Sequence, residues 1–227
     1  MWAVVPLKDL PLAKQRLAAV LSLEERRGLF AAMAQDVLAA LAAARGLAGI
    51  LAVTRDAECT ALAERYGARI CPEPENHGHT AAVHAAAALL RAEGAAGLLQ
   101  VPGDVPLATA AEIEAVLAAH RAAPAFTIVP SADRKGSNCI ALSPPGAVAL
   151  RFGDDSFFPH LAAARAAGIE PTVLPLPGLA RDIDTPEDLS ALLATPGTTR
   201  AHTYLSQSGI AGRLSNTPAG RAAAGAD

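Results

Sequence analysis

Two aspartates one residue apart, Asp182 and Asp184, have the residue type and the spacing to do chemistry. They lie in the stretch "ARDIDTPEDL", residues 180–189. Aspartate is a poor strand former, and in an extended chain alternate side chains point to the same face. Two like charges on one face repel each other unless they face water or share a cation, and hard cations such as magnesium take carboxylate oxygens. The pair is therefore a candidate metal site.

The four residues after the pair are explained by a helix start. Thr185 has the side chain of a helix cap, Pro186 suits the first helical position, and Glu187 and Asp188 place acids in the first turn. These signals predict a helix after Thr185. They leave the aspartate pair itself unexplained.

A third carboxylate, Asp104, follows the most apolar strand candidate, "AGLLQV", in the segment "VPGDVPL". In open parallel sheets, ligands bind at the carboxyl ends of the strands, so an acid at this position is a candidate metal ligand. It is equally well explained as a turn aspartate in a loop rich in Pro and Gly. Because Asp104 and the pair all follow strand candidates, the three carboxylates could converge.

The loop after the first strand candidate is basic. The segment "PLKDLPLAKQRL" contains Lys8, Lys14 and Arg16, and it matches neither the Walker lysine loop nor the dinucleotide-binding glycine pattern. Such cations can bind phosphates, or they can be a solvated basic surface. Together with three carboxylates at strand ends, they favour a phosphate-rich ligand and a divalent ion.

Other polar residues give weaker signals. The loops "GSN" (136–138) and "GDDS" (153–156) suit backbone contact with an anion, and they suit plain turns as well. His77, His79 and His84 lack acid or cysteine partners at a zinc spacing, so we expect no zinc there. We interpret His160, on a predicted helix face, as structural.

The elements that must position these residues alternate along the chain, which predicts a single-domain α/β fold with a doubly wound, mostly parallel sheet. After residue 124 two strand candidates follow each other, which predicts a small β excursion carrying a site loop. We expect residues 1–194 to form the domain and 195–227 a tail whose last dozen residues are disordered. Within the tail, residues 204–214 could dock as a short amphipathic piece. The strand candidates are residues 2–7, 49–54, 68–73, 96–101, 125–132, 138–144 and 172–177, and the helix candidates are 23–44, 56–67, 79–94, the segment from Thr109, 156–168 and 184–194.

The composition narrows the class of partner. The 227 residues are 52% hydrophobic with a formal net charge of -3 and no basic block, which argues against nucleic acid or an anionic membrane as partner. No apolar run approaches the roughly 20 residues of a membrane span. The N-terminal segment has no basic leader, and the three cysteines are odd in number and widely spaced, so we expect a cytoplasmic protein without disulfides. Partners should be small molecules, or a second copy of the chain in a homodimer.

Taken together, these motifs resemble a known family, the CofC/FbiD-type guanylyltransferases of coenzyme F-420 biosynthesis, relatives of the MobA-like nucleotidyltransferases. The resemblance covers residues 2–193, and order and spacing match as a set. Its carriers are "VPLKDLPLAKQRL", "LSLEERRGLFAAMAQDVLAAL", "VPGDVPL", "KGSNCIAL", "FGDDSFFPHLAAA" and "LARDIDTPEDL".

The resemblance implies a Rossmann-like nucleotide-diphospho-sugar transferase fold and a defined reaction. The phosphate of a three-carbon phospho-acid would attack the α-phosphorus of GTP and release pyrophosphate, with magnesium as cofactor. No protein base would be needed, because the attacking phosphate is already ionised. By this resemblance the metal ligands are Asp104, Asp182 and Asp184, with Lys14 catalytic beside them; the nucleotide residues are Lys8, Lys14, Arg16, Gly78 and Thr80; and the acceptor residues are Ser137, Gly153 and Ser156.

Three departures from the family pattern bear on substrate choice. Ser137 stands where the family usually has Thr, "GHTAAV" replaces a "GLNAAL"-like segment, and "FGDDS" replaces "FGPGS". Family members use 2-phospho-L-lactate, phosphoenolpyruvate or 3-phospho-D-glycerate, and the methyl group lost at Ser137 favours the last, which is bulkiest.

Two other functions compete with this reading. One is a MobA-like transferase with a sugar phosphate or molybdopterin as acceptor, which the lack of a glycine-rich, Arg-containing first loop disfavours. The other is an inactive nucleotide-binding regulatory module. The presence of all three candidate metal ligands argues against this second function, because an inactive module would most simply arise by losing them.

Overall fold

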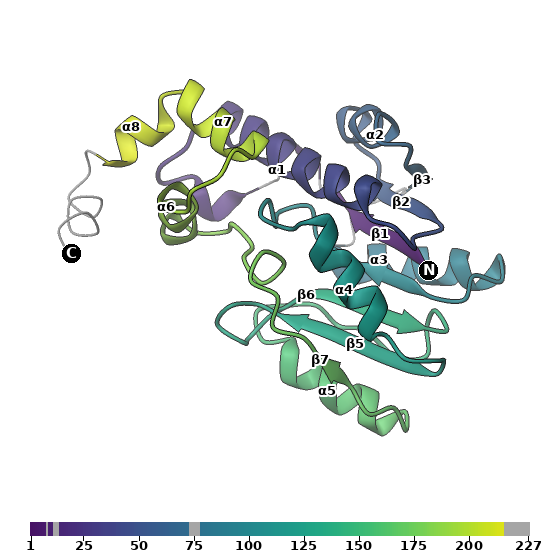
Figure 1. The fold of residues 1–227 in the computed structure, drawn as a ribbon. Helices are drawn as coiled ribbons and strands as arrows, with labels where there is room; N and C mark the ends of the chain where they lie inside the picture. The colour runs from purple at the N-terminus through teal and green to yellow at the C-terminus, as the bar shows by residue number, and fades with distance from the viewer. Residues whose placement is uncertain (8, 11–13, 73–77, 216–227) are drawn as a thin grey trace.

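The structure is a computed structural model, and it describes residues 1–7, 9–10, 14–72 and 78–215. Strands and helices alternate along most of this length (Figure 1). The strands are β1 (Trp2–Pro6), β2 (Gly49–Thr54), β3 (Arg69–Pro72), β4 (Leu98–Gln100), β5 (Ala125–Pro130), β6 (Ser137–Ser143) and β7 (Thr172–Val173). The helices are the 3-10 helix η2 (Gln15–Leu17), α1 (Leu23–Ala43), α2 (Ala57–Glu64), α3 (His79–Ala92), α4 (Ala110–Ala119), α5 (Phe157–Ala166), α6 (Pro186–Ala194), α7 (Arg200–Gln207) and α8 (Ile210–Ser215).

The strands form one seven-stranded sheet in the order β3-β2-β1-β4-β6-β5-β7. Strand β6 runs antiparallel to both of its neighbours, and the other ladders are parallel. The predicted α/β class with a mostly parallel sheet is thus confirmed. Strands β5 and β6 form the antiparallel hairpin predicted after residue 124, and this hairpin is part of the main sheet: β6 is inserted between β4 and β5, where all seven of its residues are buried.

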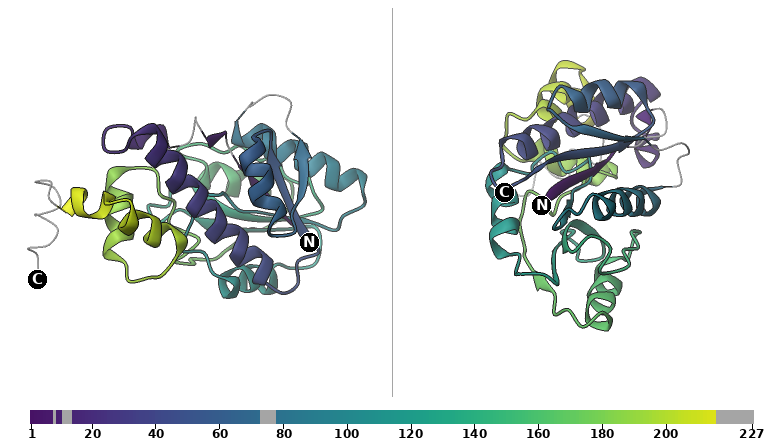
Figure 2. Two further views of the ribbon diagram at one scale, coloured as in Figure 1. Left: turned by 90° about the horizontal axis from the view of Figure 1, so that it is seen from above. Right: turned by 90° about the vertical axis from the view of Figure 1, so that its right-hand side faces the viewer.

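Helices cover both faces of the sheet, and alternate residues of β1 show the two layers. Val5 belongs to a core with residues of α1, α2, α4, α6 and α7, whereas Val4 belongs to a core with residues of α3 and α5. Figure 2 shows α1 running along its face of the sheet with α7 alongside. Within the described part of the chain, none of the helices combines the length and apolar composition that a membrane span requires.

Helices α1 and α4 both begin after a capping hydroxyl with a glutamate three residues later, but the two glutamates bind different groups. Ser22 and Glu25 form a complete capping box before α1, with the Ser22 hydroxyl accepting from Glu25 N. At α4 the Thr109 hydroxyl accepts from Glu112 N, but the Glu112 carboxylate accepts from the backbone N–H groups of Gly178 and Leu179 at 2.7 and 3.2 Å. Glu112 therefore fixes the distant segment before α6 instead of closing its own helix start.

The three cysteines are buried packing residues, and they form no disulfides with one another. Burial raises the pKa of Cys59 to about 12, and it raises the pKa of Cys139 still further above its ordinary value. A thiol with such a pKa stays protonated at neutral pH and is a poor nucleophile. The expectation of a chain without disulfides is confirmed for these cysteines.

The chain continues to pack beyond residue 194, where the sequence predicted the start of a tail. Ala201, Leu205 and Ile210 are fully buried in the same core as α1. The Asp36 carboxylate of α1 accepts from the first N–H groups of α7, Arg200 N at 2.8 Å and Ala201 N at 2.9 Å. Residues 204–214 therefore dock against the domain, through Leu205 and Ile210 in its core. The predicted disorder of the last dozen residues falls on 216–227, outside the described residues.

If α7 belongs to the domain, Leu205→Ala should lower the free energy of unfolding by about 2–5 kcal/mol, because it removes a fully buried side chain from a packed core. Ser206→Ala, on the exposed side of the same helix, should change it by less than about 0.5 kcal/mol. Urea denaturation of both variants measures the difference. Equal, small effects would show that the segment is a tail after all.

Candidate active site

A pocket of about 960 Å³ opens at the carboxyl ends of β1 and β4. This is the edge of a parallel sheet where loops and helix N-termini gather. The reversed direction of β6 places its first residues, Ser137 and Asn138, at the same edge, because Ile140 lies opposite Gln100 at the end of β4. The pocket wall also includes residues of the loops before α5 and α6 and the first residues of α3.

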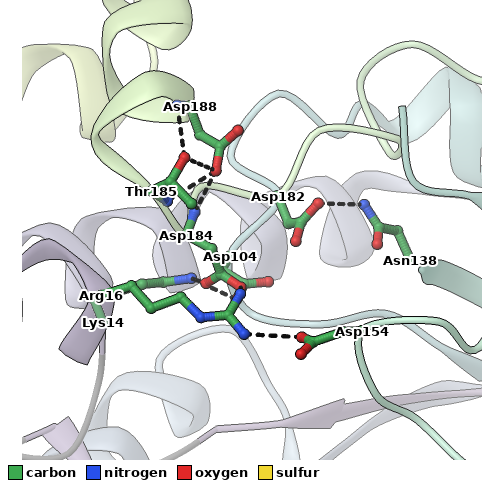
Figure 3. A network of polar contacts seen from close by, with 9 residues as sticks. All are labelled: Lys14, Arg16, Asp104, Asn138, Asp154, Asp182, Asp184, Thr185 and Asp188. Atoms are coloured by element: carbon green, nitrogen blue, oxygen red, sulfur yellow. Dashed lines mark hydrogen bonds and ion pairs between the residues drawn. The ribbon is translucent and has the colours of Figure 1, made fainter. Parts of the chain in front are cut away.

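Two carboxylates of the pocket wall, Asp104 and Asp184, share the buried Lys14 ammonium (Figure 3). Its Nζ donates to Asp104 Oδ2 and to Asp184 Oδ1, each at 2.6 Å, and only 3% of the Lys14 side-chain surface is exposed. Burial alone would lower the pKa of Lys14, but the charges of Asp104 and Asp184 outweigh burial and raise it. Lys14 is therefore a fixed positive charge in this site.

The backbone at Lys14 is in the left-handed region, with φ 55° and ψ 43°. For a residue with a side chain this conformation costs on the order of 1 kcal/mol. It is followed at once by η2, whose residue Leu17 donates its N–H to the Lys14 carbonyl at 3.0 Å. The turn thus aims the side chain back toward the strand ends, and the two ion pairs offset its cost.

The two aspartates of the pair face the pocket, as the period-two reading of "RDID" predicts. Ile183 between them is 2% exposed and packs into the core, and its N–H donates to the Asp104 carbonyl at 3.1 Å. The segment lies outside the sheet, so this single bond joins it to the β4 loop. Just after the pair, at the predicted helix start, Asp188 and Thr185 form a complete capping box, and Asp188 also accepts from Asp184 N at 3.1 Å.

Asp182 has a different partner from Asp184. Its Oδ1 accepts from the Asn138 side-chain amide at 3.0 Å. Burial raises the pKa of Asp182, the nearby charge of Asp104 raises it further, and the Asn138 bond partly opposes both. Asp182 thus carries the charge effect of Asp104, whereas Asp104 itself is paired with Lys14.

Arg16 lies at the exposed mouth of the pocket. Its Nη2 donates to Asp154 Oδ1 at 2.8 Å, and its Nη1 lies 4.0 Å from Asp184 Oδ2. The hydrogen bond and the charge of Asp154 raise the pKa of Arg16. Asp154, one of the acids that depart from the family pattern, is therefore neutralised by a residue predicted to bind phosphate.

The residues predicted to bind the acceptor acid all line the pocket, and so do two of the predicted nucleotide residues, Gly78 and Thr80. Ser137 and Ser156 are 8% and 4% exposed, and a Cβ at Gly153 would meet no atom within 4 Å. Gly78, at φ 87°, is the residue before α3. Thr80 Oγ1 accepts from Phe152 N at 3.0 Å, so this threonine joins α3 to the loop before α5. Lys8, the remaining predicted nucleotide residue, lies outside the described residues, as does His77.

Two site residues were missed by sequence reasoning. Asn138 lies in the "GSN" loop, whose small polar residues signalled a site without singling out the amide. His160 was interpreted as a structural residue on a helix face, yet its Nδ1 lies 2.9 Å from Ser137 Oγ. Nothing in the local sequence around His160 indicates that contact, because 23 residues separate the two.

The donor set at Asp104 and Asp184 fits magnesium, which prefers carboxylate oxygens and is held by one or two carboxylates together with substrate phosphates. Their oxygens already converge on one cation, the Lys14 ammonium. In the described ranges no three acid, imidazole or thiol groups are placed to hold a metal at once. The predicted magnesium site thus remains a prediction, with Asp104 and Asp184 as its best-placed ligands and Asp182 alongside.

Comparison with known proteins gives one family and many relatives. The family model "Guanylyl transferase CofC like" matches residues 1–225. A phosphoenolpyruvate guanylyltransferase of Rubrobacter xylanophilus is 39% identical over 86% of this chain and 95% of its own length. A 2-phospho-L-lactate guanylyltransferase of Methanothermobacter thermautotrophicus is 32% identical over 89% and 88%, and a 3-phospho-D-glycerate guanylyltransferase of Colwellia psychrerythraea is 33% identical over 86% and 93%.

Solved structures share the fold. A protein of Desulfovibrio desulfuricans, with a provisional assignment as a nucleotide-diphospho-sugar transferase, superposes with a TM-score of 0.73 over 94% of this chain and 97% of its own. The two sequences are 18% identical, so the likeness concerns the fold alone. It confirms the nucleotide-diphospho-sugar transferase fold expected from the motifs.

Replacing Lys14 with Met tests whether a metal ion can take the place of the ammonium. In the presence of a chelator, Lys14→Met should lower the free energy of unfolding by about 1–3 kcal/mol, because it leaves Asp104 and Asp184 without their counter-charge. Millimolar magnesium should then raise the melting temperature of Lys14→Met more than that of the wild type. Calorimetric melting with and without the ion measures both effects.

The matched control is Arg27→Met, which breaks an exposed ion pair with Glu58 far from the pocket. It should cost less than about 1 kcal/mol and leave the response to magnesium unchanged. A magnesium response that is the same in all three proteins would remove Asp104 and Asp184 from the metal site.

Proposed function

This chain belongs to the CofC family of guanylyltransferases, and from that premise we propose that it transfers GMP from GTP to phosphoenolpyruvate. The family makes it a GTP-dependent nucleotidyltransferase acting on a phosphorylated three-carbon acid, a reaction that fits coenzyme F-420 biosynthesis. The choice of acid is supported by relatives: five that are 36–40% identical are named for phosphoenolpyruvate, while those named for the other two acids are 32% and 33% identical. This outweighs the single missing methyl group at Ser137 that favoured 3-phospho-D-glycerate.

The observation that carries the proposal is the buried Lys14 ammonium, which is paired with Asp104 and Asp184 of the pocket wall. A polyphosphate is bound by cations, and a divalent ion is bound by carboxylate oxygens. This cluster contains an ammonium and two carboxylates in direct contact. The pocket, at about 960 Å³, is large enough for a nucleotide and a small acid together.

The proposed reaction exchanges one phosphorus–oxygen bond for another. A phosphate oxygen of the acid forms a bond to the α-phosphorus of GTP, and the bond between that phosphorus and the bridging oxygen of pyrophosphate breaks. The bonding pair leaves with pyrophosphate. The attacking phosphate is already ionised at neutral pH, so no side chain has to remove a proton.

Residues of this chain would orient the two anions. Lys14 and Arg16 supply positive charge for the triphosphate, and Ser137 and Ser156 line the part of the pocket assigned to the acid. Magnesium, held by Asp104 and Asp184 with Asp182 nearby, would offset the repulsion between two anions and the charge that develops at phosphorus. Positioning and charge compensation are then the main sources of rate.

The decisive assay offers each of the three phospho-acids separately, with magnesium and GTP, and follows the release of pyrophosphate. We expect phosphoenolpyruvate to give a kcat/KM at least about tenfold above the other two acids, a difference of about 1.4 kcal/mol in transition-state binding. A preference for 3-phospho-D-glycerate or 2-phospho-L-lactate would correct the acceptor. Binding of GTP without release of pyrophosphate for any acid would favour the regulatory module.

Removing one carboxylate should separate chemistry from folding. Asp184→Asn should reduce turnover by about 100-fold or more, because the residue loses the negative charge that both Lys14 and a metal would use. Glu187→Gln, an exposed acid three residues later, removes the same charge outside the pocket and should keep wild-type activity. Wild-type turnover by Asp184→Asn, with both variants folded by circular dichroism, would exclude the carboxylate from the mechanism.

A further inference from the structure

A buried series of hydrogen bonds connects the backbone, through His160, to two serines on the acceptor side of the pocket. Arg151 N donates to His160 Nε2 at 2.9 Å, His160 Nδ1 lies 2.9 Å from Ser137 Oγ, and the hydroxyls of Ser137 and Ser156 are 3.2 Å apart. His160 itself is 1% exposed. Both serines line the pocket, so this series of hydrogen bonds ends at the pocket wall.

The backbone contact fixes the tautomer of His160. An amide N–H can only donate, so Nε2 must carry a lone pair and accept. Burial lowers the pKa of His160 to about 4, so the ring is neutral at physiological pH and has one N–H. That N–H is therefore on Nδ1, and it donates to Ser137 Oγ.

This fixes the direction of the hydrogen bonds at the serines. Ser137 Oγ accepts from His160, so it cannot donate back to the ring. The bond between Ser137 and Ser156 uses one of their two hydroxyl hydrogens, whichever serine donates it. In the part of the chain that the structure describes, these are the hydrogen bonds of the two hydroxyls, so one O–H is left to donate into the pocket.

The ring is also held in place by packing. Phe152 meets it edge to face with the ring centroids 5.1 Å apart, and Phe152 is followed directly by Gly153 of the pocket wall. The orientation of His160 is thus set by a backbone donor on one side and an aromatic ring on the other. It leaves the imidazole little freedom to turn away from Ser137.

We infer that His160 is a positioning residue for the acceptor: it makes the Ser137–Ser156 pair a hydrogen-bond donor aimed at a negatively charged oxygen of the phospho-acid. The inference rests on the proposed function, since it concerns the acceptor half of that site. A neutral ring suits this role, because it orders the donor without adding a charge to the pocket.

Two variants of His160 separate its two hydrogen bonds. In His160→Gln the amide oxygen can replace Nε2 and accept from Arg151 N, but no donor remains near Ser137. In His160→Asn the amide N–H₂ can replace Nδ1 and donate to Ser137, while the Arg151 bond is lost. Both remove the ring, so a purely structural role would affect both variants in the same way.

We expect His160→Gln to raise the KM for the acceptor acid about tenfold while the KM for GTP stays within about twofold, because an ionic hydrogen bond loses its orientation. His160→Asn should stay within about threefold of the wild type in both constants. His120→Gln is the matched control. His120 also bridges two hydroxyls, Thr127 Oγ1 at 3.0 Å and Ser143 Oγ at 2.9 Å, and neither is among the described residues of the pocket wall.

Equal changes in both His160 variants, or an unchanged acceptor KM in His160→Gln, would overturn the inference. The proposed function would still stand in that case, provided that the wild-type protein turns over one of the three acids. Long-range ¹H–¹⁵N NMR of the wild type gives a second readout, which must show the proton on Nδ1; a proton on Nε2 would also overturn it. If the wild type neither binds nor converts any of the three acids in the presence of GTP, the proposed function fails and this inference fails with it, whatever the tautomer.

Discussion

The sharing of one ammonium by two carboxylates is the interaction on which the site depends. Lys14, Asp104 and Asp184 come from three loops that the sheet alone would leave unconnected, and their two contacts of 2.6 Å hold those loops together. Each charge needs the others, because an unpaired charge in this partly buried position would be strongly destabilising. Any metal ion that binds these same oxygens of Asp104 and Asp184 must therefore share them with the lysine or displace it, which ties metal binding to the position of the buried ammonium.

The architecture was largely predictable because it depends on local periodicity. Strand and helix signals alternate at lengths that admit one class of fold, and the period-two reading of "RDID" put Asp182 and Asp184 on one face, which is the face of the pocket. The position of β6 was not predictable in the same way. Its sequence is that of any buried strand, and its insertion between β4 and β5 follows from pairings of residues some 40 positions apart. That insertion is nevertheless what brings Ser137 and Asn138 to the active edge.

Contacts between residues far apart in the sequence could not be predicted from this chain's local patterns. Glu112 has the spacing of a capping residue but binds the backbone of Gly178 and Leu179, which fixes the segment leading to Asp182. The residues after 194 are small and polar enough to indicate a tail, yet Asp36 caps α7 and Leu205 completes the core. In each case the deciding partner is more than 60 residues away, so no local pattern records it.

The two sides of the pocket differ in the groups that they offer to an anion. Lys14 and Arg16 offer full positive charges, already paired with Asp104, Asp184 and Asp154, whereas Ser137 and Ser156 offer a neutral donor ordered by a neutral imidazole. Strong cations at both sides would stabilise bound substrates as much as the transition state and gain nothing in turnover. A neutral donor with a fixed direction instead orients the acid and leaves its phosphate free to attack. On our proposal, discrimination among three-carbon acids of similar charge would depend on where that one hydrogen points, and hence on His160.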